Sequence, residues 1–207
     1  MDTAVGLVKA YLELCGYFAL AELPVRVADG GTYRDATDLD IIAVRFPHPP
    51  VVLPQRVARP LDVFLGSDPA LNTFEAGVDV IVGEVKEGRA RLNPALRHEQ
   101  TIAFALRRLG CCPETAVQAE ARAVARAGVH EMAMPGQMRC RIRLVAFAGY
   151  GSLPERNMLT IELGHCVRFI SERLRSARDI LAGAQFKDAV LGILALQDKL
   201  ARAPTSE

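Results

Sequence analysis

The stretch Val78-Asp-Val-Ile-Val-Gly-Glu-Val85, followed directly by Lys86, gives the clearest structural signal in the sequence. It is a nearly continuous apolar run of strand length, which is typical of a central strand that is covered on both faces. A carboxylate and an ammonium group at the end of such a strand are costly to bury unless they are paired or bound to something. Glu84 and Lys86 are therefore the first candidates for a functional site.

A second strand is predicted over residues 39–46, which read LDIIAVRF. Side chains alternate between the two faces of a strand, so Asp38 and Asp40 share one face, as Glu84 and Lys86 do on the neighbouring strand. The two strands together place carboxylates beside a lysine. Carboxylate oxygens are the ligands that Mg²⁺ and Mn²⁺ prefer, and a bound metal ion activates water and polarises phosphoryl oxygens.

The rest of the chain predicts an α/β (α+β) architecture with one central mixed sheet flanked by helices. Residues 47–77 hold six of the twelve prolines, and we predict a partly ordered insertion there. We divide the chain into a core, 1–150, and a C-terminal strand and helical extension, 151–207, packed on that core. Further strands are expected at 17–27, 139–147 and 158–163, and helices at 3–15, 94–109, 114–127, 165–180 and 187–201.

Composition limits the classes of protein that fit. The chain has 207 residues, half of them hydrophobic, and a formal net charge of +1. Its apolar runs are shorter than the ~18 residues of a membrane span, and its five cysteines contain no C-x-x-C pair, which favours a cytoplasmic protein with reduced thiols. The neutral total hides an asymmetry, because residues 1–83 carry −5, residues 84–178 carry +7 and residues 179–207 carry −1. A nucleic-acid partner is therefore compatible with the charge.

The charged strands resemble the PD-(D/E)XK phosphodiesterase superfamily, which has the restriction-endonuclease-like fold. The resemblance spans roughly residues 5–110, and the family core is a helix, three strands, a helix and a strand. Leu39 stands at the position of the namesake proline. The motifs that carry the resemblance are TDLDIIA at 37–43, VGEVK at 82–86 and YLELCGYF at 11–18.

The resemblance implies metal-dependent cleavage of a nucleic-acid phosphodiester bond, with DNA favoured over RNA as substrate. Asp40 and Glu84 would be ligands of Mg²⁺ or Mn²⁺, and Lys86 would be the catalytic lysine. The backbone carbonyl of Val85, which lies between the two charged residues, is a natural additional ligand.

Four further residues are candidate accessory groups. Glu13 falls near the position where some family members place an extra acidic residue on the first helix, although its register does not match. Asp38 could assist or replace Asp40. His98 and Gln100 could line the site from the helix after the third strand, and an exposed helical histidine is the alternative interpretation of His98.

Alternating arginines on the strand 139–147 predict a polar face that could contact phosphates. A solvated face opposite Glu162 is the alternative. The residues assigned to nucleic-acid contact are Arg89, Arg91, Arg139, Arg141 and Arg143.

Three functional hypotheses remain open from the sequence. The first is a Mg²⁺- or Mn²⁺-dependent endonuclease. The second is a catalytically inactive, nuclease-like subunit that binds nucleic acid or serves assembly. The third treats the charges as strand-end ion pairs and assigns oligomerisation to the helical C-terminal third, and a homodimer or larger complex is compatible with all three.

Overall fold

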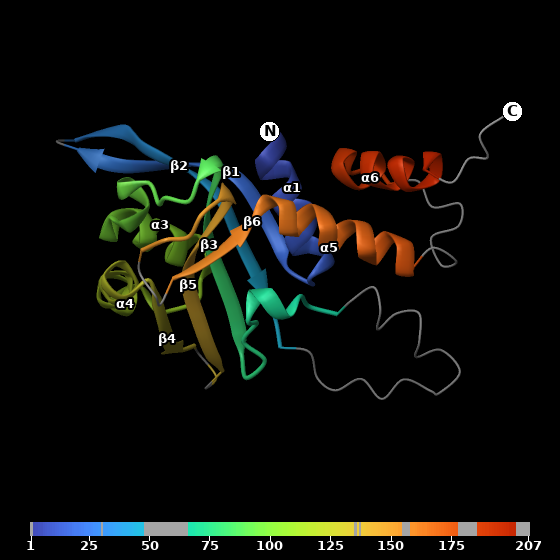
Figure 1. The fold of residues 1–207 in the computed structure, drawn as a ribbon. Helices are drawn as coiled ribbons and strands as arrows, with labels where there is room; N and C mark the ends of the chain where they lie inside the picture. Colours follow the sequence, from blue (N-terminus) through green and yellow to red (C-terminus); the bar gives the residue numbers. More distant parts are fainter. Residues whose placement is uncertain are drawn as a thin grey trace, which may run out of the picture.

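The computed structural model describes residues 2–29, 31–47, 66–134, 136, 138–154, 158–177 and 186–201. Most of the predicted proline-rich insertion, residues 48–65, lies outside these ranges. The described residues form a mixed α/β structure, which confirms the predicted class. One curled mixed sheet runs through the centre, and helices pack on both of its faces (Figure 1).

The sheet combines an antiparallel meander with a parallel pair. The first three strands are antiparallel neighbours, and β3 then pairs in parallel with β5. The other edge of β5 is shared: β4 is antiparallel to its first half, and β6 is parallel to its second half. The strands are β1 (Phe18–Asp29), β2 (Thr32–Arg45), β3 (Val78–Arg89), β4 (Val129–Ala133), β5 (Arg139–Tyr150) and β6 (Leu159–Glu162).

The helices divide between the two faces of the sheet. On one face α1 packs with α5, and α6 lies against both; α3 and α4 cover the opposite face (Figure 1). Two short 3-10 helices, η1 and η2, precede β3 and α3 respectively. The bounds are α1 (Thr3–Leu14), η1 (Pro69–Leu71), η2 (Pro94–Arg97), α3 (Glu99–Leu109), α4 (Glu114–Ala127), α5 (Leu163–Ser176) and α6 (Ala189–Leu200).

Strand β3 lies between two hydrophobic cores, one on each face of the sheet. Ile81 packs into the core beneath α1 and α5, whereas Val80 and Val82 pack into the core beneath α3 and α4. The first eight residues of β3 are all buried. This two-sided burial explains why the sequence of the strand is an almost unbroken apolar run.

The largest differences from the predicted elements concern β2, the helix expected from Pro94, and β4. Strand β2 begins at Thr32 because it pairs with β1 from Asp29 onward in a long hairpin. The helix predicted from Pro94 is interrupted at His98, whose extended backbone separates η2 from α3. Strand β4 was not predicted, and the last residues of the helix expected at 165–180 lie outside the described ranges.

Within the ranges that the structure describes, no helix is both long enough and apolar enough to cross a membrane.

Candidate functional site

The candidate site lies where β2 separates from β3. Pairing between these strands ends at Ile41 and Gly83, and Asp40 is the next residue of β2 beyond that pair. The carboxylate of Asp40 then takes the place of a ladder carbonyl, because its Oδ2 accepts the backbone N–H of Val85 at 2.8 Å. This bond fixes the Asp40 side chain beside β3.

A backbone irregularity in β1 lies at the same level. Glu22 adopts a left-handed backbone conformation with φ of 54°, and regular pairing with β2 is interrupted opposite Asp40. Ile41 packs into the core beneath α1, but Leu39 packs into the core beneath α3. Residues two apart on a regular strand share a face of the sheet, but Leu39 and Ile41 lie on opposite faces. The switch between the two faces therefore occurs at Asp40, whose carboxylate is directed to β3.

Lys86 brings the two carboxylates together. Its Nζ forms an ion pair with Glu84 Oε1 and lies 4.0 Å from Asp40 Oδ2. The Glu84 side chain is only 4% exposed, whereas Lys86 and Asp40 are partly accessible. Burial raises the pKa of Glu84, and although the Lys86 ammonium opposes this rise, the charge of Asp40 adds to it. A further cation at this point would relieve the repulsion between the two carboxylates.

Asp40 and Lys86 open into a cleft of about 580 Å³. Its walls come from the start of α1, the irregular part of the β1–β2 hairpin and the end of β3. Asp38, one of the predicted accessory residues, lies in this wall. Sequence reasoning missed three other acidic residues of the cleft because they come together only through the placement of α1 and the bend at Glu22. These residues are Asp2, Glu22 and Glu87.

The chemistry of these groups fits a hard divalent cation. The donors are carboxylate oxygens, which Mg²⁺ and Mn²⁺ prefer, and a positive group already lies between two of them. Among the residues that the structure describes, no group of three or more His, Cys, Asp or Glu side chains is placed to hold a metal ion. The predicted ligand set contains two carboxylates, Asp40 and Glu84, and it needs the Val85 carbonyl or water for the remaining positions.

The other predicted accessory residues lie outside the cleft. Glu13 forms an ion pair with Lys9 at 2.6 Å near the end of α1, about 12 Å along the helix axis from the cleft residue Val5. His98 and Gln100 are exposed at the start of α3, and neither lines the cleft. The structure therefore brings Asp38, but not these three residues, to the predicted site.

The arginine face of β5 points to a buried carboxylate, in place of the phosphate contacts that we expected. Arg143 is only 6% exposed and binds Asp79 Oδ2 at 2.8 Å, while Arg141 binds the same oxygen at 3.1 Å. The Tyr17 hydroxyl donates to Asp79 at 2.7 Å and completes the network. The predicted opposing residue Glu162 lies instead beside Ala148, at the other end of β5.

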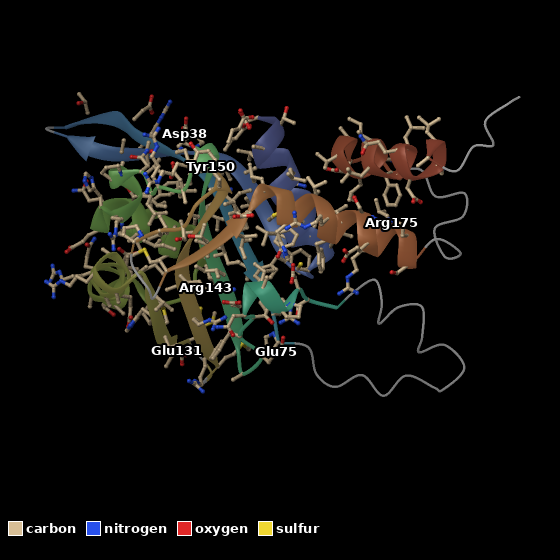
Figure 2. The ribbon with its side chains drawn as sticks, viewed as in Figure 1. Asp38, Glu75, Glu131, Arg143, Tyr150 and Arg175 are labelled. Atoms are coloured by element: carbon tan, nitrogen blue, oxygen red, sulfur yellow. The ribbon has the colours of Figure 1, made fainter. Side chains whose placement is uncertain are left out.

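The remaining candidate arginines are accessible. Arg139 is exposed at the start of β5, where it pairs with Glu131 and lies over the ring of Phe74. Arg89, the last residue of β3, and Arg91, two residues beyond it, are both exposed. Arg89 pairs across the sheet with Tyr150, which Figure 2 shows at the same end of the sheet as Asp38.

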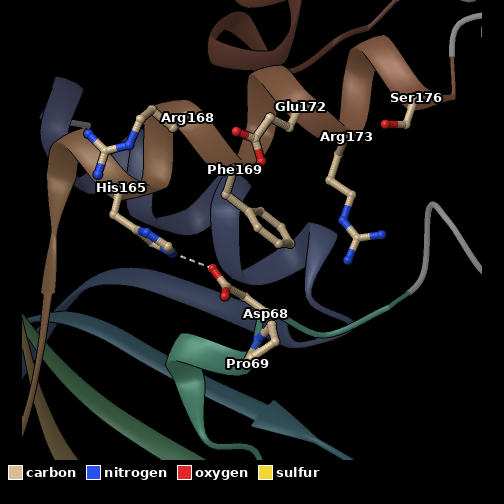
Figure 3. Close-up of a pocket in the computed structure, with 8 residues that line it drawn as sticks. All are labelled: Asp68, Pro69, His165, Arg168, Phe169, Glu172, Arg173 and Ser176. Atoms are coloured by element: carbon tan, nitrogen blue, oxygen red, sulfur yellow. Dashed lines mark hydrogen bonds and ion pairs between the residues drawn. The ribbon is translucent and has the colours of Figure 1, made fainter.

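A second polar cluster, which the sequence did not predict, lies between η1 and α5 (Figure 3). Asp68 accepts a hydrogen bond from the Tyr11 hydroxyl at 2.8 Å and contacts His165 Nε2 at 2.5 Å. Its other oxygen accepts the backbone N–H of Ala70 and so caps η1. The sequence favours simple helix packing for His165. The structure shows that it joins α5 to η1, beside a pocket of about 380 Å³ that also contains Arg168.

Comparison with known proteins yields no match to a protein-family model, to a curated protein or to a solved structure.

Proposed function

We propose that the protein is a Mg²⁺- or Mn²⁺-dependent nuclease that cleaves phosphodiester bonds, with DNA as the preferred substrate. The observation that carries the proposal is the convergence of Asp40, Glu84 and Lys86 from two strands, at the point where β2 leaves β3. Two carboxylates with a lysine beside them, of which Asp40 and Lys86 line an acidic cleft and Glu84 is buried behind Lys86, form a site for a hard cation and a phosphate ester.

The order of the elements supports the same proposal. The chain runs through α1, the three antiparallel strands β1 to β3, then α3, and later β5, which pairs in parallel with β3. This is the helix, three strands, helix and strand order that the resemblance to PD-(D/E)XK proteins implies. In this chain α4 and β4 are inserted between α3 and β5.

Each residue of the site has a distinct role in this proposal. Asp40, Glu84 and the Val85 carbonyl would hold the metal ion, which when bound lowers the pKa of a coordinated water and polarises a phosphoryl oxygen. Lys86 moves from its contact with Glu84 to orient the attacking water and to stabilise the charge that develops on the phosphate. Arg89 and Arg91, exposed beyond the end of the site, would contact neighbouring phosphates of the strand.

The test is cleavage of supercoiled plasmid, single-stranded DNA and RNA by the purified chain in Mn²⁺, Mg²⁺ or EDTA. We expect cleavage only with metal, and we expect Asp40→Asn, Glu84→Gln and Lys86→Ala each to reduce the rate by at least about 10²-fold. Glu13→Gln is the matched control, because it removes a carboxylate of α1 that lies outside the cleft. It should leave the rate unchanged.

Two results would contradict the proposal. Cleavage that persists in all three site variants would assign the activity to another part of the chain or to a contaminant. Metal-independent binding of DNA without cleavage would instead favour the inactive, nuclease-like subunit. The ion pair of Lys86 with Glu84 and the Asp40–Val85 hydrogen bond would then be structural contacts. Calorimetric titration with Mn²⁺ distinguishes the nuclease from the inactive subunit, because only the nuclease requires Asp40 and Glu84 to bind metal.

A further inference from the structure

Helix α6 carries an apolar stripe that faces outward. None of its residues is buried, and Ile193, Leu196 and Leu200 are 59%, 53% and 64% exposed. With Ala189, which is also exposed, these positions are spaced by four, three and four residues, which is the spacing of the buried seam of a coiled coil. The opposite side of α6 already packs on the core beneath α1 and α5. The helix is therefore apolar on both sides, although only one side has a partner among the described residues.

An apolar groove of about 420 Å³ adjoins this stripe. It lies between α1, α5 and α6, and Glu87 is the one charged residue in its lining. The groove is continuous with the stripe through Ile193, which belongs to both. The apolar residues of its lining are Ala4, Leu7, Leu163, Val167, Val190, Ile193 and Leu194.

We propose that this face binds a second copy of the chain, with the two α6 helices antiparallel about a twofold axis. An antiparallel seam centred between Ile193 and Leu196 places Ile193 against the partner's Leu196. The same symmetry places Leu200 against the partner's Ala189. Two large side chains thus pack against each other near the centre of the seam, and towards its ends the small Ala189 accommodates Leu200, the most exposed leucine of the stripe.

The surface is suited to a copy of itself. A twofold interface requires one patch to supply both of the complementary shapes, and here the ridge of Ile193 and Leu196 adjoins its own groove. Each end of α6 carries one acidic and one basic residue, so two antiparallel helices meet without net repulsion. These residues are Lys187 and Asp188 at the start, and Asp198 and Lys199 at the end.

The expected size of the interface requires the groove as well as the helix. A stable interface buries about 800 Å² per partner, which four side chains of a twelve-residue helix do not reach. Val167 of α5 is 37% exposed and lines the groove, so the contact extends from α6 across α5 toward α1. The stripe contains none of the site residues, whereas the groove shares Ala4 and Glu87 with the wall of the candidate cleft. The inference does not rest on the proposed nuclease activity, because it is argued from the apolar surface alone.

The first test is the mass of the full chain in solution, measured by light scattering on a size-exclusion column. We expect twice the 22.5 kDa of one chain for the wild type and 22.5 kDa for Leu196→Glu. Leu196 is exposed, so this change should leave the helical circular dichroism and the melting temperature of the monomer nearly unchanged. Gln118→Glu, which adds the same charge to an exposed position of α4, is the control and should remain dimeric.

The second test fixes the orientation. Two variants are made in a Cys112→Ser background, one with Ile193→Cys and the other with Leu196→Cys. When the two are mixed under mild oxidation, a disulfide should form between unlike chains. The Ile193→Cys variant alone should form far less disulfide. Cross-linking of Ile193→Cys to itself would overturn the antiparallel arrangement. A monomeric wild type at all concentrations, or a dimer that Leu196→Glu leaves intact, would overturn the proposed interface.

Discussion

Asp68 is a buried carboxylate whose charge is held by three hydrogen-bond donors from different elements. Burial alone would raise its pKa, yet the hydrogen bonds from Ala70, His165 and Tyr11 outweigh burial and hold the pKa below the ordinary 3.8. The ionised carboxylate of Asp68 therefore links α1, η1 and α5, because each of these elements supplies one of its hydrogen-bond donors. Because the folded state lowers this pKa, the resulting stabilisation is fully present above about pH 4 and is lost as the pH falls through the folded-state value.

Asp68→Asn should accordingly lower the free energy of unfolding by about 1–3 kcal/mol at pH 7. The difference from the wild type should shrink below pH 4, since protonation then removes the charge that distinguishes the two proteins. Urea unfolding as a function of pH measures the effect. Asp35→Asn is the control, because Asp35 pairs with Arg26 where both side chains are largely exposed, and its loss should cost less than about 1 kcal/mol. An equal loss at pH 7 and pH 3 would show that the charge of Asp68 is unimportant.

At the scale of single elements, the sequence was informative where local pattern alone decides the structure. The apolar run of β3 and the alternation of side chains in β2 and β3 indicated that Asp40, Glu84 and Lys86 would come together. The contacts of Lys86 with both carboxylates confirm this proximity. The alternating arginines of β5 were also correctly placed on one face. Their partner Asp79 could not be identified, because it lies in the apolar β3 run and meets Arg141 only through parallel pairing.

Other parts of the site depend on tertiary placement that no local pattern records. The acidic wall of the cleft needs α1 to bring Asp2 to Glu22, whose side chain accepts the Asp2 backbone N–H at 2.7 Å. The left-handed backbone of Glu22 has no local sequence signal, since glutamate rarely adopts that conformation. Short β4 was missed because its sequence, VHEMA, does not alternate between apolar and polar residues.

The close contact between β3 and β5 beside the site can be tested with two glycines, Gly88 of β3 and Gly149 of β5. A Cβ atom on Gly149 would overlap the carbonyl oxygen of Glu87, whereas a Cβ on Gly88 meets open space. Gly149→Ala should therefore destabilise the fold by about 1–3 kcal/mol, because the two strands must separate where Lys86 leaves the sheet. It should also weaken Mn²⁺ binding. Gly88→Ala should change stability by less than about 0.5 kcal/mol, and thermal unfolding of both variants is the measurement.

At the scale of the whole molecule, opposed charges shape any contact with nucleic acid. The part of the chain before Glu84 is acidic and the part from Glu84 to residue 178 is basic. Several of the basic groups are already paired within the protein, as Arg143 is with Asp79 and Arg107 is with Glu114. We therefore expect DNA binding to depend on a few accessible arginines rather than on a broad positive surface.

The salt dependence of DNA binding tests this expectation. In a Glu84→Gln background, in which we expect cleavage to be slowed, the affinity for duplex DNA should fall as salt rises. Replacing Arg89 and Arg91 by alanine should make the plot of log affinity against log salt shallower by about 0.9 for each phosphate that is no longer neutralised. Arg126→Ala, at an exposed position of α4 away from the cleft, should leave the slope unchanged. An unaltered slope in the double variant would exclude these two arginines from the interface.

The parallel pairing of β3 with β5 also sets the order in which the chain assembles. The hairpin of β1 and β2 closes locally, between Asp29 and Thr32, whereas the central parallel pair joins Val78 to Cys140 across the whole of α3 and α4. Closing so long a loop reduces chain entropy before any interaction compensates for it, so we expect this pairing to be slow and to come late. Glu84 acquires its neighbour Ala146 only at that step. We therefore expect the Glu84 carboxylate to be among the last groups to leave water as the protein folds.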